Sequence, residues 1–343
     1  MRRVDMSKPI TIIGEAYGEA EDKAKRPFVG ASGQELTRML NEAGIDRGDC
    51  FLTNVFNIRP PGNKIEAFTG PKAVALRGYP ALIKGKHIRA EFEHELTRLG
   101  DEVLSADSNL VICLGNTPLW AMAGTTGISK LRGTTLVSSH TVSGYKLLPT
   151  YHPAAVLRQW ELRPTTIVDL MKAKREALYP EVRRPKREIH IEPSLSDIRS
   201  FFNEYLPGCR CLGVDIETSG NQITCIGFSP GTNRAIVIPF VDSRRMGRNY
   251  WNDTPTELAV WKLVKDVLGQ PDPPKVFQNG VYDIAFLWRS YGIKVRGARH
   301  DTMLLHHALH PEALKGLGYL GSVYTDEGSW KHMRKTSTIK RDE

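Results

Sequence analysis

The sequence predicts two α/β domains in tandem. The chain has 343 residues, which is more than one compact core commonly holds. Strand-like and helix-like runs alternate in two separate series, and a stretch rich in proline and charge lies between them. We therefore expect domains at residues 1–178 and 195–330, a linker at 179–194 and a disordered tail at 331–343.

In the first series, short apolar runs predict strands and longer amphipathic runs predict helices. The expected strands are 10–13, 50–58, 109–114 and 146–149, and the expected helices are 35–43, 117–123 and 167–178. This order is typical of a sheet with helices packed on it.

The second series follows three prolines in the charged stretch 179–193. Its expected helices are 195–205, 255–268 and 282–291, and its expected strands are 211–216, 224–228 and 235–238. A second α/β unit follows from this pattern.

The composition is that of an ordinary globular protein with a basic balance. A formal net charge of +9 suits binding to phosphate backbones, although a basic protein without a nucleic-acid role would look the same on charge alone. Five dispersed cysteines argue against a disulfide scaffold. The sequence has no apolar run of about 20 residues and no export signal, so we expect a soluble cytoplasmic protein without membrane contact.

Five short motifs stand in order along the first domain. A Gly-Glu-Ala-Tyr-Gly motif directly after a strand could let the backbone approach a ligand, yet alone it is equally a strand-to-helix turn. The set occupies residues 14–18, 26–33, 53–63, 114–116 and 151–158. Taken together, the motifs resemble the uracil-DNA glycosylase superfamily, most closely its family 4, over residues 8–178, which implies a three-layer α/β/α sheet domain.

The resemblance implies a role for each central residue. Phe28 would stack on a base flipped out of the DNA, and Asn54 would pair with the uracil edge through its amide. His152 would donate a hydrogen bond to the uracil oxygen that gains negative charge. Glu15 would handle the attacking water or favour the cationic sugar. Taken singly, each residue also has an ordinary structural explanation in a core, a turn or a hydrogen-bonded loop.

Further residues carry over from the same motifs. Gly14, Ala16 and Tyr17 would line the base pocket. Val156, Leu157 and Arg158 fall where the family inserts an apolar side chain into the gap left by the flipped base, with a cation beside the phosphates.

Two features depart from family 4. Those enzymes usually hold an iron–sulfur cluster on four cysteines, whereas this domain offers only Cys50 and Cys113, so we expect no cluster. Tyr17 stands where the family usually has proline, and its ring could either exclude the thymine methyl group or obstruct the pocket.

The second domain carries paired carboxylates. Asp215 and Glu217 lie two apart in a strand and point to one face, although two solvated acids at a strand end would give the same pattern. Asn279 and Asp283, and then Asp301, follow in an order that resembles the proofreading 3′→5′ exonuclease domain of family A DNA polymerases and its DnaQ-like relatives.

That resemblance covers residues 195–330 and implies a ribonuclease-H-like fold. Asp215, Glu217 and Asp283 would bind Mg²⁺ or Mn²⁺, Asn279 would contact the substrate, and Asp301 would cap a helix. The family needs a fourth carboxylate preceded by a tyrosine or histidine, but residues 302–343 contain no Tyr-x-x-x-Asp or His-x-x-x-x-Asp, and neither Asp326 nor Asp342 fits. We therefore expect a C-terminally incomplete domain with weak or absent exonuclease activity.

The two modules in this order look like the front end of certain bacteriophage DNA polymerases. The leading hypothesis is a phage-type replication or repair protein in host cytoplasm that binds uracil-containing or single-stranded DNA, with a separate polymerase polypeptide as a possible partner. The rival hypothesis is a non-catalytic DNA-binding or polymerase-tethering module from a split polymerase. A metabolic phosphate-binding enzyme would explain the glycines but neither the histidine loop nor the paired acids.

Overall fold

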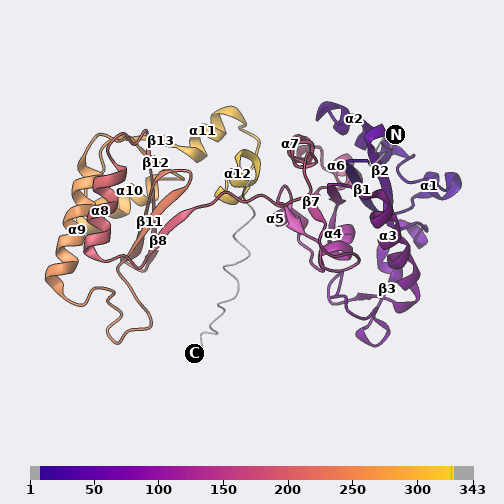
Figure 1. Cartoon of the computed structure of the whole chain (residues 1–343), viewed down its shortest axis with the longest axis horizontal. Helices are drawn as coiled ribbons and strands as arrows, with labels where there is room; N and C mark the ends of the chain where they lie inside the picture. Colours follow the sequence, from indigo (N-terminus) through magenta and orange to yellow (C-terminus); the bar gives the residue numbers. More distant parts are fainter. Residues whose placement is uncertain (1–7, 326, 328–343) are drawn as a thin grey trace, which may run out of the picture. The chain divides into compact units, whose positions relative to one another are not determined.

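The computed structural model describes residues 8–325 and residue 327. Residues 8–184 together with 318–325 form one compact unit, the first unit, and residues 185–317 form the second unit (Figure 1). The tail predicted at 331–343, Asp326 and Asp342 lie outside the described residues. Within the described part, none of the helices has the length and apolar character needed to cross a membrane.

The first unit is built on a five-stranded sheet in the order β2-β1-β5-β7-β6. Its first four strands in that order run parallel, and β6 pairs antiparallel with β7. The strands of the unit, including a small two-stranded sheet of β3 and β4, are β1 (Ile10–Ala16), β2 (Cys50–Phe56), β3 (Thr69–Gly70), β4 (His87–Ile88), β5 (Leu110–Leu114), β6 (Leu136–Val137) and β7 (Lys146–Thr150). The helices are α1 (Glu19–Ala24), α2 (Ala31–Glu42), α3 (Glu93–Ala106), α4 (Asn116–Ala123), α5 (Ile128–Leu131), α6 (Pro153–Arg158), α7 (Arg163–Glu176) and α12 (Leu317–Tyr324).

Helices cover both faces of this sheet because its strands are apolar on both sides. Ile13 of β1 packs in a core with Leu99 of α3 and Trp120 of α4. Its neighbour Ile12 points the other way, into a core with Met39 of α2 and Leu170 of α7. Buried parallel strands read as continuous apolar runs for this reason. The predicted three-layer α/β/α arrangement is confirmed.

The start of the predicted linker is fixed to the first unit by a buried lysine. Lys146 of β7 is 1% exposed, and its Nζ donates to the backbone carbonyls of Glu176, Tyr179 and Glu181 at 2.7, 2.5 and 3.1 Å. The ammonium group also lies 3.9 Å from the centre of the Tyr179 ring. A buried ammonium group needs such partners, because an unpaired charge is costly to bury.

The second unit is a six-stranded sheet in the order β13-β12-β9-β10-β11-β8. The central strands β9, β10 and β11 pair antiparallel, and β12 joins β9 in parallel. The elements are β8 (Glu188–Ile191), α8 (Leu195–Tyr205), β9 (Leu212–Ser219), β10 (Gln222–Gly231), β11 (Arg234–Pro239), α9 (Thr254–Gly269), β12 (Lys275–Phe277), α10 (Val281–Tyr291), β13 (Ala298–Asp301) and α11 (Thr302–Leu309). One apolar core contains Phe202 of α8, Phe228 of β10, Val264 of α9 and Leu287 of α10.

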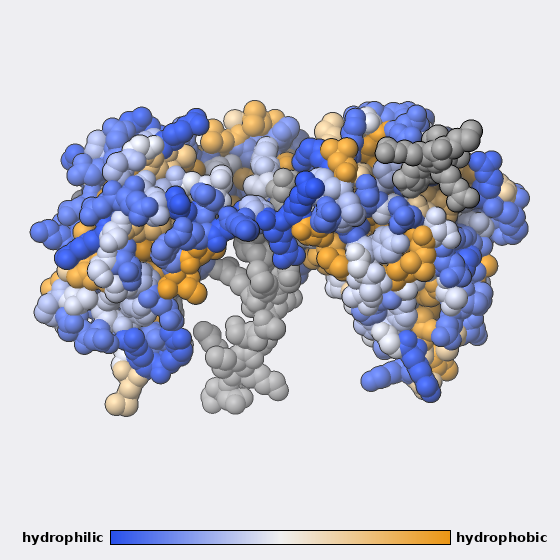
Figure 2. All heavy atoms as spheres, viewed as in Figure 1, coloured by the Kyte–Doolittle hydropathy of each residue, from blue (hydrophilic) through white to orange (hydrophobic). Residues whose placement is uncertain are grey.

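Residues 318–325 return from the second unit to pack within the first. Leu320 is 5% exposed, the Tyr319 hydroxyl lies 2.7 Å from Thr165 Oγ1, and Lys172 Nζ donates to the Thr325 carbonyl. The sequence pattern predicts that this segment belongs to the second domain, whereas in the structure it belongs to the first unit. On the visible face of both units, hydrophilic residues dominate and apolar residues form small separate patches (Figure 2).

Candidate functional site

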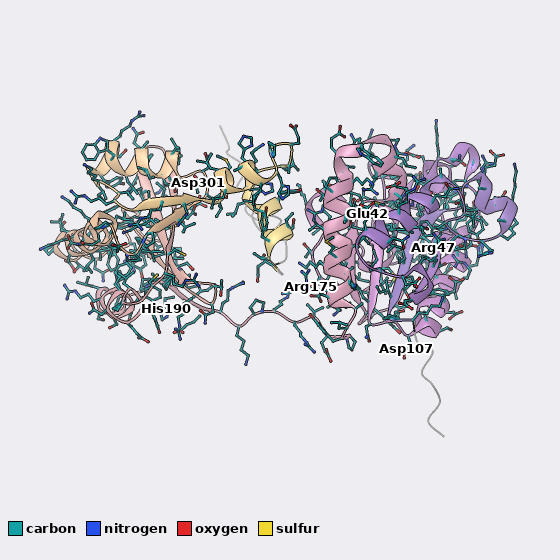
Figure 3. All side chains as sticks on the ribbon, turned by 90° about the horizontal axis from the view of Figure 1, so that it is seen from above. Glu42, Arg47, Asp107, Arg175, His190 and Asp301 are labelled. Atoms are coloured by element: carbon teal, nitrogen blue, oxygen red, sulfur yellow. The ribbon has the colours of Figure 1, made fainter. Side chains whose placement is uncertain are left out.

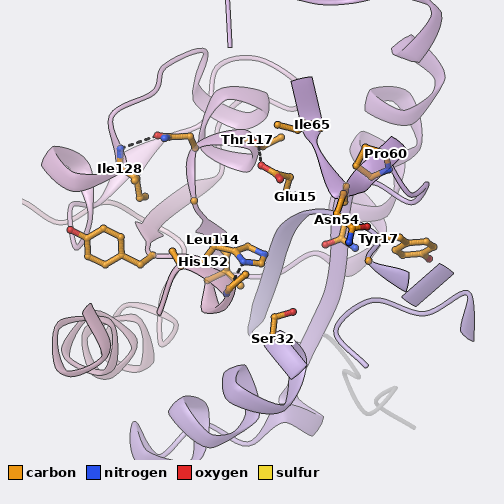
Figure 4. A pocket seen from close by; sticks show the side chains of 18 of the residues that line it. Glu15, Tyr17, Ser32, Asn54, Pro60, Ile65, Leu114, Thr117, Ile128 and His152 are labelled. Atoms are coloured by element: carbon orange, nitrogen blue, oxygen red, sulfur yellow. Dashed lines mark hydrogen bonds between the residues drawn. The ribbon is translucent and has the colours of Figure 1, made fainter. Parts of the chain in front are cut away.

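A cavity of about 540 Å³ lies at one edge of the first sheet. Its walls include residues at the ends of four parallel strands: Glu15 on β1, Asn54 on β2, Leu114 on β5, and His152 just after β7. The carboxyl ends of parallel strands meet at one edge, which is where open α/β sheets bind ligands. Figure 4 shows Glu15, Asn54 and His152 on different sides of this cavity.

Gly14 allows two side chains to lie directly over β1. A Cβ atom at this position would be 2.3 Å from Asn54 Oδ1 and 2.5 Å from Phe28 Cζ, so any larger residue would displace both. Asn54 is only 2% exposed, and no hydrogen-bond partner for its side-chain amide is found among the described residues. A buried amide without a protein partner, in the wall of a cavity, is suited to pair with a ligand.

The backbone around Phe28 is held from both sides. Phe28 has a φ of 56°, an unusual conformation for an aromatic residue. Oε1 of Glu21 accepts hydrogen bonds from the backbone N–H groups of Val29 and Gly30 at 3.1 and 2.8 Å. Arg47 donates to the Phe28 carbonyl at 2.9 Å. These bonds hold the loop in a conformation that it would otherwise disfavour, and the ring is buried at 5% exposure.

His152 lies beside Phe28, with ring centroids 6.2 Å apart and planes 29° from parallel. Its Nδ1 accepts a hydrogen bond from the backbone N–H of Ala154 at 3.1 Å, so a neutral ring carries its proton on Nε2. Burial, reinforced by the nearby charge of Arg158, lowers the pKa of His152 to about 4, and Glu21 opposes this shift. The imidazole is therefore a neutral donor at physiological pH.

Glu15 accepts a hydrogen bond from Thr117 Oγ1 at 2.5 Å. Burial raises the pKa of Glu15; the Thr117 bond opposes this shift, and the charge of Glu66 adds to it. The cavity thus places a carboxyl group and a neutral imidazole on separate walls.

In the second unit, three acidic residues gather around β9. Asp215 and Glu217 are exposed on this strand. Asp283, on the first turn of α10, is 6% exposed and accepts a hydrogen bond from the backbone N–H of Ile216 at 3.1 Å. Burial raises the pKa of Asp283, and the charges of Asp301 and Glu217 add to this shift. Asp283 therefore lies against the strand between the other two acids.

Asp301 caps a helix, as expected. Its carboxylate accepts from the backbone N–H groups of Met303 and Leu304 at the start of α11, and from those of Asn279 and Gly280 at 3.1 and 2.8 Å. Figure 3 labels Asp301 on the second unit. Asn279 precedes α10 and has a φ of 59°, so it belongs to the turn that Asp301 holds.

The chain matches two family models. The model described as the uracil DNA glycosylase superfamily matches residues 1–178, which contain the whole strand framework of the cavity. The chain belongs to the uracil-DNA glycosylase superfamily. The model described as 3′-5′ exonuclease matches residues 194–341, so both resemblances drawn from the motifs are confirmed. Together the two matches support a function in DNA repair or nuclease chemistry, with DNA as substrate.

The chain is similar to known proteins and to solved structures. A type-4 uracil-DNA glycosylase of Thermotoga maritima is 34% identical over 169 residues, covering 48% of this chain and 76% of the relative. One from Saccharolobus solfataricus is 35% identical over 173 residues, covering 49% of this chain and 71% of the relative. Among solved structures, an EXD2 exonuclease domain matches with a TM-score of 0.28 and 14% identity, covering 40% of this chain and 69% of that chain.

The remaining residues predicted for the glycosylase pocket are placed in different ways. Gly14 lies on β1 beneath Asn54 and Phe28, while Ala16, Tyr17 and Arg158 line the cavity. The Tyr17 ring lies on the far side of Asn54 from His152, so it does not project between them (Figure 4). Leu157 is 45% exposed.

Val156 was wrongly included among the residues that could wedge into DNA. It is fully buried in the core with Leu36 and Leu148. A helix that packs on a sheet must turn one face inward, and in α6 this face carries Val156.

Several cavity residues were missed by sequence reasoning. Thr117 follows the Leu-Gly-Asn motif directly, and that position could have suggested it. The others come from segments outside the five motifs, which carry no distinctive pattern: Ile65, Leu82, Ile83 and Ile128.

The cysteines and acids do not form metal sites in this structure. Cys50 and Cys113 are buried in the cores on opposite faces of the first sheet, and burial raises the pKa of Cys50 to about 12. Nowhere in residues 8–325 do three His, Cys, Asp or Glu side chains converge closely enough to hold an ion. Asp215, Glu217 and Asp283 are thus not arranged around a common ion position among the described residues.

Proposed function

We propose that the first unit excises uracil from DNA. The observation that carries this proposal is that Phe28, Asn54 and His152, distant in the sequence, line one cavity together with Glu15. In this proposal a flipped uracil stacks on Phe28 and pairs with the unpartnered Asn54 amide. The relatives that cover most of this domain are type-4 uracil-DNA glycosylases, which supports the same choice of base.

Cleavage of the glycosidic bond leaves negative charge on the uracil and positive charge on the sugar. The cavity has one group suited to each charge. The Nε2–H of His152 stabilises the negative charge that develops on the departing uracil. A neutral imidazole is sufficient, because the Nδ1 bond to Ala154 holds the ring in place before reaction. Glu15, when ionised, stabilises the cationic sugar or orients the attacking water. Thr117 holds the Glu15 carboxylate in position.

The pH dependence of excision tests this assignment. The expected rate is constant at neutral and alkaline pH and falls in acid. Glu15 has a raised pKa, so it loses its charge at a higher pH than an ordinary glutamate. His152 keeps its neutral form until the pH approaches about 4. The measurement is the single-turnover formation of alkali-labile sites in uracil-containing DNA across this pH range. A rate that rises as the pH falls would show that a charged imidazole is needed and would contradict the proposal, as would the absence of any labile sites.

We infer for the second unit a DNA-contacting role with weak or absent exonuclease activity. Support comes from Asp215, Glu217 and Asp283, which do not converge on a metal site within the described residues. The whole chain would then be a phage-type replication or repair protein, working with a separate polymerase polypeptide. The alternative of a non-catalytic tethering module is favoured by the same unconverged acids.

Incubation with 3′-ended single-stranded DNA tests the second unit. With added Mg²⁺ or Mn²⁺, we expect little shortening of an end-labelled strand, and no further loss in an Asp283→Ala variant. The measurement is the length distribution of the labelled product over time. Extensive degradation that Asp283→Ala abolishes would contradict the proposal and establish a complete nuclease site.

A further inference from the structure

The segment that follows His152 carries two exposed apolar side chains, Leu157 and Trp160. Helix α6 begins directly after His152 and ends at Arg158, and a short 3₁₀ turn at Trp160–Leu162 follows. Leu157 is 45% exposed and Trp160 is 57% exposed. On the buried side of the same helix, Val156 packs into the core and is fully buried. Trp160 is therefore not required to fill the interior.

Trp160 lies two residues after Arg158, which lines the cavity. Indole rings bury a large apolar area when they can, and aromatic side chains are enriched where proteins bind. Trp160 follows Arg158, which lines the cavity and whose charge acts on both Glu15 and His152. An apolar and aromatic surface next to this cation suits a nucleotide chain, with bases for the ring and phosphates for the charge.

The ring is held in place rather than loosely exposed. The Arg163 guanidinium lies 5.0 Å from the Trp160 ring centre. Arg163 is itself fixed, because its Nε donates to Glu35 at 2.7 Å and its Nη1 donates to Glu42 at 2.9 Å. Figure 3 shows Glu42 beside α7, the helix that begins with Arg163. A side chain that is already oriented loses little conformational entropy on binding.

Most charges near Trp160 are paired, while Glu161, directly after it, adds one exposed acidic side chain. Arg38 and Arg163 contact Glu35, and Arg163 also contacts Glu42, so two cations balance two anions beneath the ring. No ion pair is found for Arg158 among the described residues, and its charge is available to a phosphate.

We propose that Trp160 forms a second contact with duplex DNA, stacking against a base beside the nucleotide that is flipped into the cavity. This inference rests on the proposed uracil-excising function, and it adds a residue outside the motifs that defined that function. Leu157 and Trp160 would contact the DNA stack, while Arg158 would contact the backbone. Trp160 would thereby support the distorted duplex from which the base has left.

Equilibrium binding to a short duplex that contains a non-cleavable abasic analogue tests this proposal without requiring excision. Trp160→Ala should weaken binding by about 10-fold or more, the range of losses seen when an aromatic stacking partner of a base is removed. Trp160→Phe should retain most of the affinity, because a smaller ring can still stack. The thermal unfolding temperature of both variants should match that of the wild type, since the ring is exposed.

Leu104 provides a control within the first unit, because it is 54% exposed on α3 and does not line the cavity. Leu104→Ala should leave the affinity unchanged. Unchanged affinity in Trp160→Ala would overturn the proposal, and an equal loss in Leu104→Ala would overturn it as unspecific. If the wild type binds and Trp160→Ala does not, but no uracil is released, the contact stands while the glycosylase function fails.

Discussion

Replacing Gly14 with alanine should reduce uracil excision by about 100-fold or more, because misplacement of reacting groups by about 1 Å can have an effect of this size. The added Cβ atom would lie 2.3 Å from Asn54 Oδ1 and 2.5 Å from Phe28 Cζ. Contacts this short cannot persist, so the amide and the ring must move. These are the two groups proposed to recognise the base, and single-turnover excision measures the effect directly.

The first unit should remain folded in the Gly14→Ala variant. Overpacking a buried site costs about 1–3 kcal/mol, and the two displaced groups are the outer ends of side chains, which can turn aside. A matched control is Gly100→Ala on α3, where the nearest atom would lie 3.5 Å from the new Cβ atom, an ordinary contact. This control should keep the wild-type rate. Full activity in Gly14→Ala would contradict the proposed placement of Asn54 and Phe28.

Much of the first sheet could be predicted because its strands are continuous apolar runs. Strands expected at 10–13 and 109–114 correspond to β1 (Ile10–Ala16) and β5 (Leu110–Leu114). The helix expected at 35–43 begins earlier, at Ala31, because the small residues before Glu35 look like a loop. Gly33 lies in that helix, and only glycine fits there, since a Cβ atom would lie 1.9 Å from the Phe28 carbonyl oxygen. Contacts of this kind with backbone atoms leave no periodic pattern in the sequence.

In the cavity too, residues that stand in sequence motifs could be predicted, whereas residues that contact backbone atoms could not. Phe28, Asn54 and His152 stand in motifs, and the structure brings them together. Glu21 and Arg47 act on backbone groups of the Phe28 loop, and nothing in their spacing indicates that contact. Hydrogen bonds to backbone atoms depend on the path of the chain, which a list of side chains does not specify.

Short elements at the boundary of the second unit were also missed. Strand β8 (Glu188–Ile191) lies in the charged, proline-rich stretch that predicted a linker, yet it pairs with β11 at the edge of the sheet. Edge strands tolerate charge and nearby proline because one side of their backbone is unpaired.

Replacing Asp169 with alanine should destabilise the first unit by about 3–5 kcal/mol, the usual effect of removing one partner of a buried ion pair. Arg132 and Asp169 are 3% and 0% exposed and form a paired contact in which Arg132 Nε donates to Asp169 Oδ2 at 2.8 Å. Thr150 also donates to Asp169 Oδ2, at 2.7 Å. Arg132 Nη1 donates to Ser322 Oγ at 2.9 Å, and its guanidinium lies 5.5 Å from the Tyr319 ring centre. Loss of the carboxylate would leave the cation buried with partners only on α12.

The measurement is the urea-induced unfolding transition of the first unit in the full chain. Asp101→Ala serves as the control, because this exposed residue on α3 should change stability by no more than about 0.5 kcal/mol. The double variant Arg132→Met with Asp169→Leu should recover much of the loss, since apolar residues of similar size can replace a buried pair. Ser322→Ala should have a smaller effect of about 1 kcal/mol, because it removes one hydrogen bond whose donor is charged. If Asp169→Ala unfolds like the wild type, the buried cation must find another partner, and α12 would not depend on this ion pair for its place on the first unit.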